Sequence, residues 1–274
     1  MGWLNIIFML PHVVASVITF ADKEYITTYA TRLGLSSSLF AGGIFLLLAT
    51  SSLSLMIFII SIYTAYHQIA QQSGIASIIT RNRSTAHQIW KWMGFSILVF
   101  FFFISIIIPE KRAAILGRIE DILLALGIIF FVAFITVSII TARQSKTGIG
   151  ILFIAANSIM LIFHGILFTL NLTFFMVLIP RIVHDITAFA FYVSHNKNRN
   201  NETPKNVISR ALRPTKIPEY ILTPALALGI SLAMTQFMSP TILIFSLSFL
   251  ALFHYYWEGI MWKKDSPHRH HVYI

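Results

Sequence analysis

The chain has 274 residues, of which 57% are apolar and only 11% are charged, and it contains no cysteine. Soluble domains carry about 25% charged residues, so the composition indicates a polytopic membrane protein, and the missing cysteines exclude disulfides, thiolate metal sites and iron–sulfur clusters. The net charge of +10 is scattered over short segments, which favours contact with anionic lipid headgroups, and we expect no nucleic-acid partner.

Eight segments meet the requirement for a membrane-spanning helix, which is about 20 apolar residues. We expect spans at residues 3–20, 39–63, 92–108, 122–141, 149–170, 174–193, 221–237 and 241–262. Pro109 ends the third span, a polar gap at 171–173 separates the fifth from the sixth, and a tight hairpin at Ser239 and Pro240 separates the last two. The predicted fold is therefore all-α, a bundle of about eight transmembrane helices forming one domain over residues 1–274.

The distribution of Lys and Arg predicts the orientation, because these residues are enriched in cytoplasmic loops. With a cytoplasmic N-terminus, the inside segments hold 14 basic residues and the outside segments hold five. The inside segments are residues 81–91, 143–146, 197–216 and the C-terminal tail, and the outside segments include residues 22–38. We therefore expect both termini in the cytoplasm and a location in a bacterial inner membrane. Within the polar loop 196–219, residues 207–212 predict one short amphipathic turn.

Five histidines are predicted to lie in the cytoplasmic half of the membrane. At a rise of 1.5 Å per residue, His12, His184 and His254 lie deep in the first, sixth and eighth spans, and His67 and His195 lie near inner span ends. Neutral imidazole is the commonest metal ligand in proteins, and helix bundles often build metal sites from several helices. We expect these histidines to hold a metal, either as one set or with His67 and His195 forming a second position. Iron (Fe2+) is the leading choice, and another divalent transition metal is the alternative.

Two carboxylates accompany these histidines. Glu258 follows His254 by one turn on the same helix face, and we expect it to act as a ligand or as a proton acceptor. Asp185 is adjacent to His184 and points about 100° away on the helix. It is predicted to orient an imidazole or to pair with Arg181.

Other polar residues have simpler interpretations. His164 lies toward the outer half of the fifth span and is predicted to be a hydrogen-bonded packing residue. His87 and the tail histidines of HRHH, from His268, are expected to be solvated or to face lipid headgroups. Asp22 is predicted to cap the helical turn that follows it.

The run LPHVVAS from Leu10, with histidines on other spans, resembles the bacterial Brp/Blh-type β-carotene dioxygenases. These are small multi-span proteins whose iron is held by histidines alone, so the resemblance implies a histidine-held iron and an apolar, carotenoid-like substrate. The shared motif covers a small part of the chain. The family also has two ligands one turn apart on a late helix, whereas Ala188 stands one turn after His184 here.

The leading functional hypothesis is a membrane-embedded non-haem iron oxygenase or oxidoreductase that acts on a lipidic or isoprenoid substrate. Two alternatives remain open. One is a haem protein with two axial histidines, and the other is an ion- or proton-coupled transporter that uses the intramembrane histidines. The expected partners are membrane lipid and a lipophilic small molecule, and the oligomeric state is not predicted.

Overall fold

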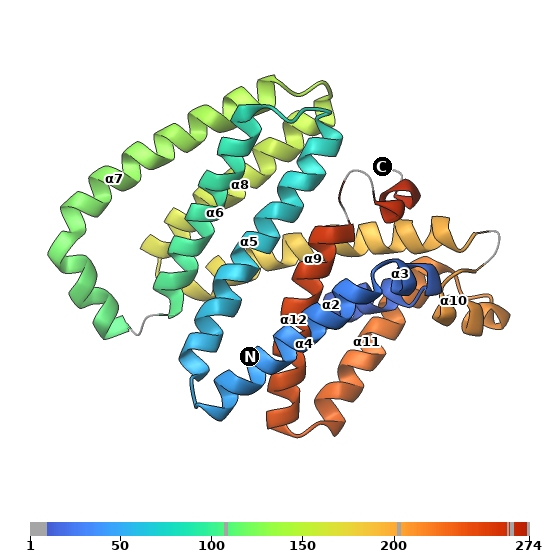
Figure 1. Ribbon diagram of the computed structural model, residues 1–274. Coiled ribbons are helices and arrows are strands. Elements are labelled where there is room, and N and C mark those ends of the chain that lie inside the picture. Colours follow the sequence, from blue (N-terminus) through green and yellow to red (C-terminus); the bar gives the residue numbers. More distant parts are fainter. Residues whose placement is uncertain (1–9, 107–108, 202–203, 262, 264–265, 273–274) are drawn as a thin grey trace. The chain divides into compact units, whose positions relative to one another are not determined.

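The computed structural model describes residues 10–106, 109–201, 204–261, 263 and 266–272. These residues form helices without any β-strand, apart from one isolated bridge between Asp22 and Asn206. Seven helices in the described ranges are long and apolar enough to cross a membrane, which confirms the predicted all-α polytopic membrane bundle. The elements, labelled as in Figure 1, are α2 (Leu10–Phe20), α3 (Lys23–Thr28), α4 (Ala30–Ala49), α5 (Leu53–Ile79), α6 (Thr85–Ile106), α7 (Pro109–Arg143), α8 (Gly148–Thr169), α9 (Thr173–Arg199), α10 (Val207–Leu212), η2 (Arg213–Thr215), α11 (Glu219–Phe237), α12 (Pro240–Met261) and η3 (Pro267–His271).

The chain divides into two compact units. Unit 1 comprises residues 1–60 and 182–274, and unit 2 comprises residues 61–181. The boundaries between them fall within α5 and α9. The single transmembrane domain expected over residues 1–274 stays a prediction.

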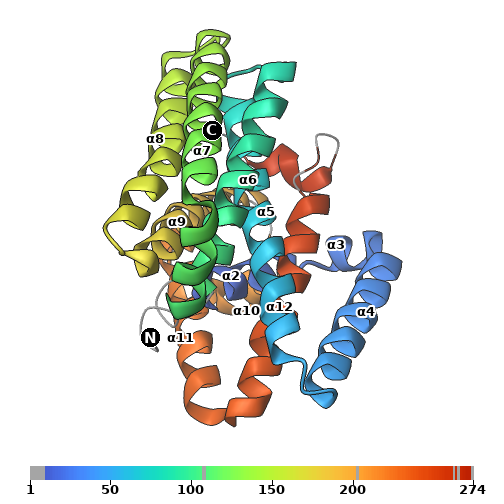
Figure 2. The same cartoon turned by 90° about the vertical axis from the view of Figure 1, so that its left-hand side faces the viewer.

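In unit 2, helices α6, α7 and α8 pack side by side (Figures 1 and 2). Their apolar core includes Trp90, whose indole N–H donates to the Ser158 hydroxyl at 2.9 Å. The turns before α6 and before α8 are bonded together, because the Thr147 hydroxyl donates to the carbonyl of Ile79 at 2.7 Å. Two loops joined in this way lie on the same membrane side, as the sequence predicts for segments 81–91 and 143–146.

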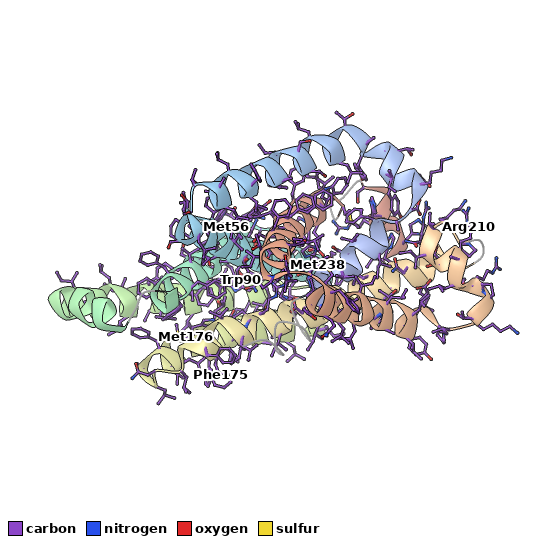
Figure 3. The ribbon with its side chains drawn as sticks, turned by 90° about the horizontal axis from the view of Figure 1, so that it is seen from below. Met56, Trp90, Phe175, Met176, Arg210 and Met238 are labelled. Atoms are coloured by element: carbon purple, nitrogen blue, oxygen red, sulfur yellow. The ribbon has the colours of Figure 1, made fainter. Side chains whose placement is uncertain are left out.

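The part of α9 that belongs to unit 2 shows how apolar residues divide between core and lipid. Met176 is fully buried in the core of unit 2, whereas the adjacent Phe175 is exposed. Figure 3 shows both side chains at the start of this helix. An exposed phenylalanine on a membrane helix faces hydrocarbon, so its exposure carries no penalty.

Unit 1 is built around α2, which packs against α11 and α12, and α12 also packs against α4. The core between α2, α9 and α11 includes Val14, Ala188 and Ala227. Figure 1 shows α11 and α12 as a helical hairpin that turns at Ser239 and Pro240, as predicted. Asp22 caps α3 by accepting from the Glu24 amide, also as predicted.

Helix α2 differs from the predicted first span. Nine of its 11 residues are buried within the protein, including polar Ser16 and Thr19. Both hydroxyls donate to carbonyls of their own helix, so neither needs water. An 11-residue helix is about 16 Å long, about half the thickness of the hydrocarbon core. The preceding part of the predicted span, residues 3–9, lies outside the described residues.

The predicted second span, residues 39–63, is wrong as one helix. Helix α4 ends at Ala49 and α5 begins at Leu53, and Ser51 between them adopts a positive φ of 55°. The Thr50 hydroxyl donates to the carbonyl of Leu46 at 2.9 Å, and the Thr50 and Ser52 hydroxyl oxygens lie 3.1 Å apart, within hydrogen-bond distance. The amides of Thr50, Ser51 and Ser52 donate to backbone carbonyls of α4, so the turn interrupts an apolar stretch without a proline or a charge and without unpaired amides.

The outside location predicted for residues 22–38 is also wrong at its start. Arg199 donates to the Asp22 carboxylate at 3.0 Å, and Val207 donates its amide to the carbonyl of Ala21 at 2.8 Å. These bonds place Asp22 on the same membrane side as the loop 197–216. If that loop is cytoplasmic, as predicted, Lys23 lies on the cytoplasmic side, and α4 is the next helix to cross the membrane. The excess of basic residues on the cytoplasmic side then becomes larger, as the positive-inside rule favours.

This topology predicts a labelling pattern that is easy to read because the chain has no cysteine of its own. Single cysteines at Lys23 and Asn201 are expected to react with a membrane-impermeant maleimide from the same side. A cysteine at Ser51 should react from the opposite side, because α4 lies between Lys23 and Ser51. Labelling in intact and opened vesicles measures the pattern. Reaction of Lys23→Cys and Asn201→Cys from opposite sides would contradict it.

Candidate metal centre

Three of the predicted ligands meet inside unit 1. His12 comes from α2, His184 from α9 and His254 from α12, and all three side chains are fully buried. One ring nitrogen of each lies within 4.8 Å of one from each of the others. The His12 ring stacks on His184 with centroids 4.7 Å apart and meets His254 edge-on at 4.4 Å.

The closest approach within this three-histidine cluster is between two Nε2 atoms. His12 Nε2 and His254 Nε2 lie 2.6 Å apart. The opposite nitrogen of each ring faces an oxygen: His12 Nδ1 lies 3.1 Å from an Asp185 carboxylate oxygen, and His254 Nδ1 lies 3.5 Å from the Tyr192 hydroxyl. Oxygen partners on Nδ1 favour the tautomer with the proton there, which leaves the lone pairs on the two Nε2 atoms.

Tyr192 connects His254 to the second predicted carboxylate. Its hydroxyl donates to Glu258, so its oxygen remains available to accept from His254 Nδ1. Glu258 therefore lies behind His254 in a hydrogen-bonded chain, and Asp185 takes the corresponding place behind His12. Sequence reasoning missed Tyr192. Its position two turns after His184 on α9 was the available signal.

A divalent ion fits this donor set. Two facing lone pairs repel each other, and a cation between them removes the repulsion. Two nitrogens bound tetrahedrally at about 2.1 Å from an ion lie about 3.4 Å apart, so the His12 and His254 rings would separate by roughly 0.8 Å to admit it. The carboxylates of Asp185 and Glu258 would balance the charge of the ion, because both are buried nearby.

Other predicted site residues belong to unit 2. His67 is buried on α5 within unit 2, and its role as a further ligand stays a prediction. Arg181 is also buried in unit 2. His164 has a ring nitrogen 2.9 Å from each of two carbonyls, those of Met160 and Met176, as expected for a packing residue.

Two histidines predicted to be solvated are buried. His87 Nε2 lies 2.9 Å from the Ser73 hydroxyl within unit 2. His268 is fully buried in unit 1, where η3 folds back against the helices. Their sequence context of basic residues suggested water, but tertiary packing encloses both rings.

His195 is not brought into the three-histidine cluster. Its Nε2 lies 2.9 Å from the Tyr25 hydroxyl, and its ring stacks on His268 at 5.9 Å. His268 in turn lies 3.6 Å from the Tyr25 ring and stacks on Tyr29 at 5.4 Å. The C-terminal tail is thus held by an aromatic cluster at the end of α9.

Burial, together with the smaller effects of nearby His195, Arg199 and His271, lowers the pKa of His268 to about 3. The released tail has an ordinary histidine pKa near 6.5, so it takes up a proton that the docked tail excludes. Docking is therefore strongest above about pH 6.5 and weakens as the pH falls toward 3, at about 1.4 kcal/mol per pH unit.

We expect the backbone amides of residues 268–272 to lose protection from hydrogen exchange between about pH 7.5 and about pH 5, after correction for intrinsic rates. His268→Phe keeps an aromatic ring in the cluster but cannot titrate. Its tail should therefore stay protected over the same range. Equal protection of the wild-type tail at both pH values would show that His268 does not control docking.

Comparison with known proteins identifies no relative. No family model, no curated protein and no solved structure matches the chain. The three-histidine cluster and the acidic partners behind it are therefore the features of the chain that bear on its function.

Proposed function

We propose that the protein is a membrane-embedded metalloenzyme in which His12, His184 and His254 hold one metal ion. The observation that carries this proposal is the approach of the His12 and His254 Nε2 atoms to 2.6 Å, with an acidic partner behind each ring. With the protons on Nδ1 of both rings, neither Nε2 can donate to the other. The short contact is then not a hydrogen bond that packing alone would favour.

We propose iron as the metal, with another divalent transition metal as the alternative. Imidazole suits iron, copper, nickel and zinc, so the ligands alone leave a choice. Iron supplies dioxygen chemistry when bound, and that chemistry suits a lipidic or isoprenoid substrate, which offers few groups for hydrolysis. The reaction class is therefore an oxygenase or oxidoreductase, in a bacterial inner membrane.

The chain's own residues would have three tasks in this reaction. Asp185 would hold the proton on His12 Nδ1, and Tyr192 would do the same for His254. Glu258 would keep the Tyr192 hydroxyl oriented and would accept a proton at its carboxylate. The aromatic rings of Phe189 and Tyr192, which meet His12 edge-on, would exclude water.

The geometry argues against a haem protein. Two axial histidines place their Nε2 atoms roughly 4 Å apart on opposite faces of a macrocycle. The 2.6 Å separation leaves no space for a ring between His12 and His254, and His184 stacks on His12.

Elemental analysis of the purified protein tests the proposal, together with an absorption spectrum and oxygen uptake on an apolar polyene. About one iron per chain without a Soret band, with substrate-dependent oxygen uptake, is the expected result. A metal-free protein in which His12→Ala changes only ion flux would instead support the transporter.

A further inference from the structure

We propose that residues 205–217, here called the basic segment, form a binding surface for anionic phospholipid headgroups. The segment carries Lys205, Arg210, Arg213 and Lys216, and it contains no acidic residue. All four cations are exposed. Figure 3 shows Arg210 on the outer side of α10.

Hydrogen bonds hold the basic segment against the rest of unit 1. Asn206 caps α10 and donates its side-chain amide to the carbonyl of Ile18 at 2.6 Å. Ser209, on the inner face of α10, donates to Glu219 at 2.7 Å. Because the inner face is bonded in this way, α10 presents a constant outer face instead of moving as a loose loop.

The exposed side of the basic segment mixes cations with apolar side chains. Val207 and Ile217 are 55% and 45% exposed, and they flank Arg210 and Arg213. Exposed apolar side chains gain no free energy from contact with water. Apolar side chains that enter the headgroup region beside cations that pair with phosphates are typical of segments lying in the membrane interface.

The position in the chain selects the bilayer as the partner. The basic segment joins two membrane-spanning helices, α9 and α11, and Ile217 is two residues before α11 begins at Glu219. Clusters of Lys and Arg at the cytoplasmic end of a span attract anionic lipid. The occupant is therefore the phosphate-bearing headgroup of the surrounding membrane, not a soluble acidic partner.

A single fluorescent reporter tests the proposal in the full-length protein. Val207→Cys gives the chain its only thiol, which accepts an environment-sensitive dye. The protein is reconstituted in vesicles of phosphatidylcholine alone, or with about a third of the lipid replaced by anionic phosphatidylglycerol. We expect a blue shift and quenching by headgroup nitroxides in the anionic vesicles, both reduced at high salt.

Two charge variants complete the test. The triple variant Arg210→Gln, Arg213→Gln and Lys216→Gln removes three charges from the segment. It should reduce the blue shift seen in anionic vesicles by at least about tenfold. The control is Arg81→Gln, Arg143→Gln and Lys146→Gln, which removes the same charge from exposed positions of unit 2 and should leave the response intact.

An equal dye environment in both kinds of vesicle would overturn the proposal, and so would an equal effect of the two triple variants. Quenching by a soluble acidic peptide, with no lipid dependence, would indicate a protein partner instead. None of these readouts involves the metal, so the lipid surface and the proposed enzyme can fail independently.

Discussion

Alanine at His12, His184 or His254 is expected to lower the metal content of the purified protein from about one ion per chain to less than about a tenth of that. Each variant removes one of the three proposed imidazole ligands, and the two that remain would bind a divalent ion far more weakly. Metal content is measured after gel filtration, so that only folded protein is counted.

The matched control for these variants is His164→Ala. It also removes a buried histidine from a membrane helix, but that ring contacts backbone carbonyls and lies outside the three-histidine cluster. It should retain its metal. Equal loss from His164→Ala would attribute the effect to destabilisation, and full retention in His12→Ala would remove that residue from the site.

Glu258→Gln is expected to keep a substantial part of the metal and to lose turnover of an apolar substrate by roughly 100-fold or more, the scale of a lost general base. Glutamine can still accept from the Tyr192 hydroxyl, so the orientation behind His254 survives. The negative charge and the proton acceptor are lost. Steady-state oxygen uptake and metal analysis of the same preparation measure the two effects separately.

Glu219→Gln is the control for this variant. Glu219 is another carboxylate of unit 1 that accepts from hydroxyls, those of Ser209 and Thr223, but it lies at the start of α11. Its turnover should match the wild type. Unchanged turnover in Glu258→Gln would leave a centre that works through histidines alone, as the Brp/Blh-type resemblance implies.

The sequence predicted the helical fold well because hydropathy records which residues face lipid. It predicted the short helix at Val207–Leu212 and the hairpin at Pro240 for a related reason, since turn residues there interrupt apolar runs. It failed at Thr50–Ser52, because serine and threonine are common inside membrane helices. Only the tertiary structure shows that these hydroxyls support a turn.

His12 could be predicted as a site residue because it lies near the middle of its apolar segment. His12 lies nine residues after Trp3 and ten before Asp22, so its estimated depth is similar whichever end of that segment is cytoplasmic. The depth predicted for His12 therefore does not depend on the wrong location of Asp22. The pairing of Asp185 with His12 depends on how α2 packs, which no spacing in the sequence reveals.

The separation of His12 and His254 along the chain has a consequence for biosynthesis. The two rings that meet at 2.6 Å are 242 positions apart. At about 5–20 residues per second, a ribosome makes His254 roughly 10–50 s after His12. An ion that needs both ligands can therefore be captured only after α12 has been made, so loading belongs to the final stage of assembly. Once captured, the ion would close a loop of that length. The lost conformational entropy of the unfolded chain would then stabilise the folded state by about 5 kcal/mol, as a covalent cross-link would.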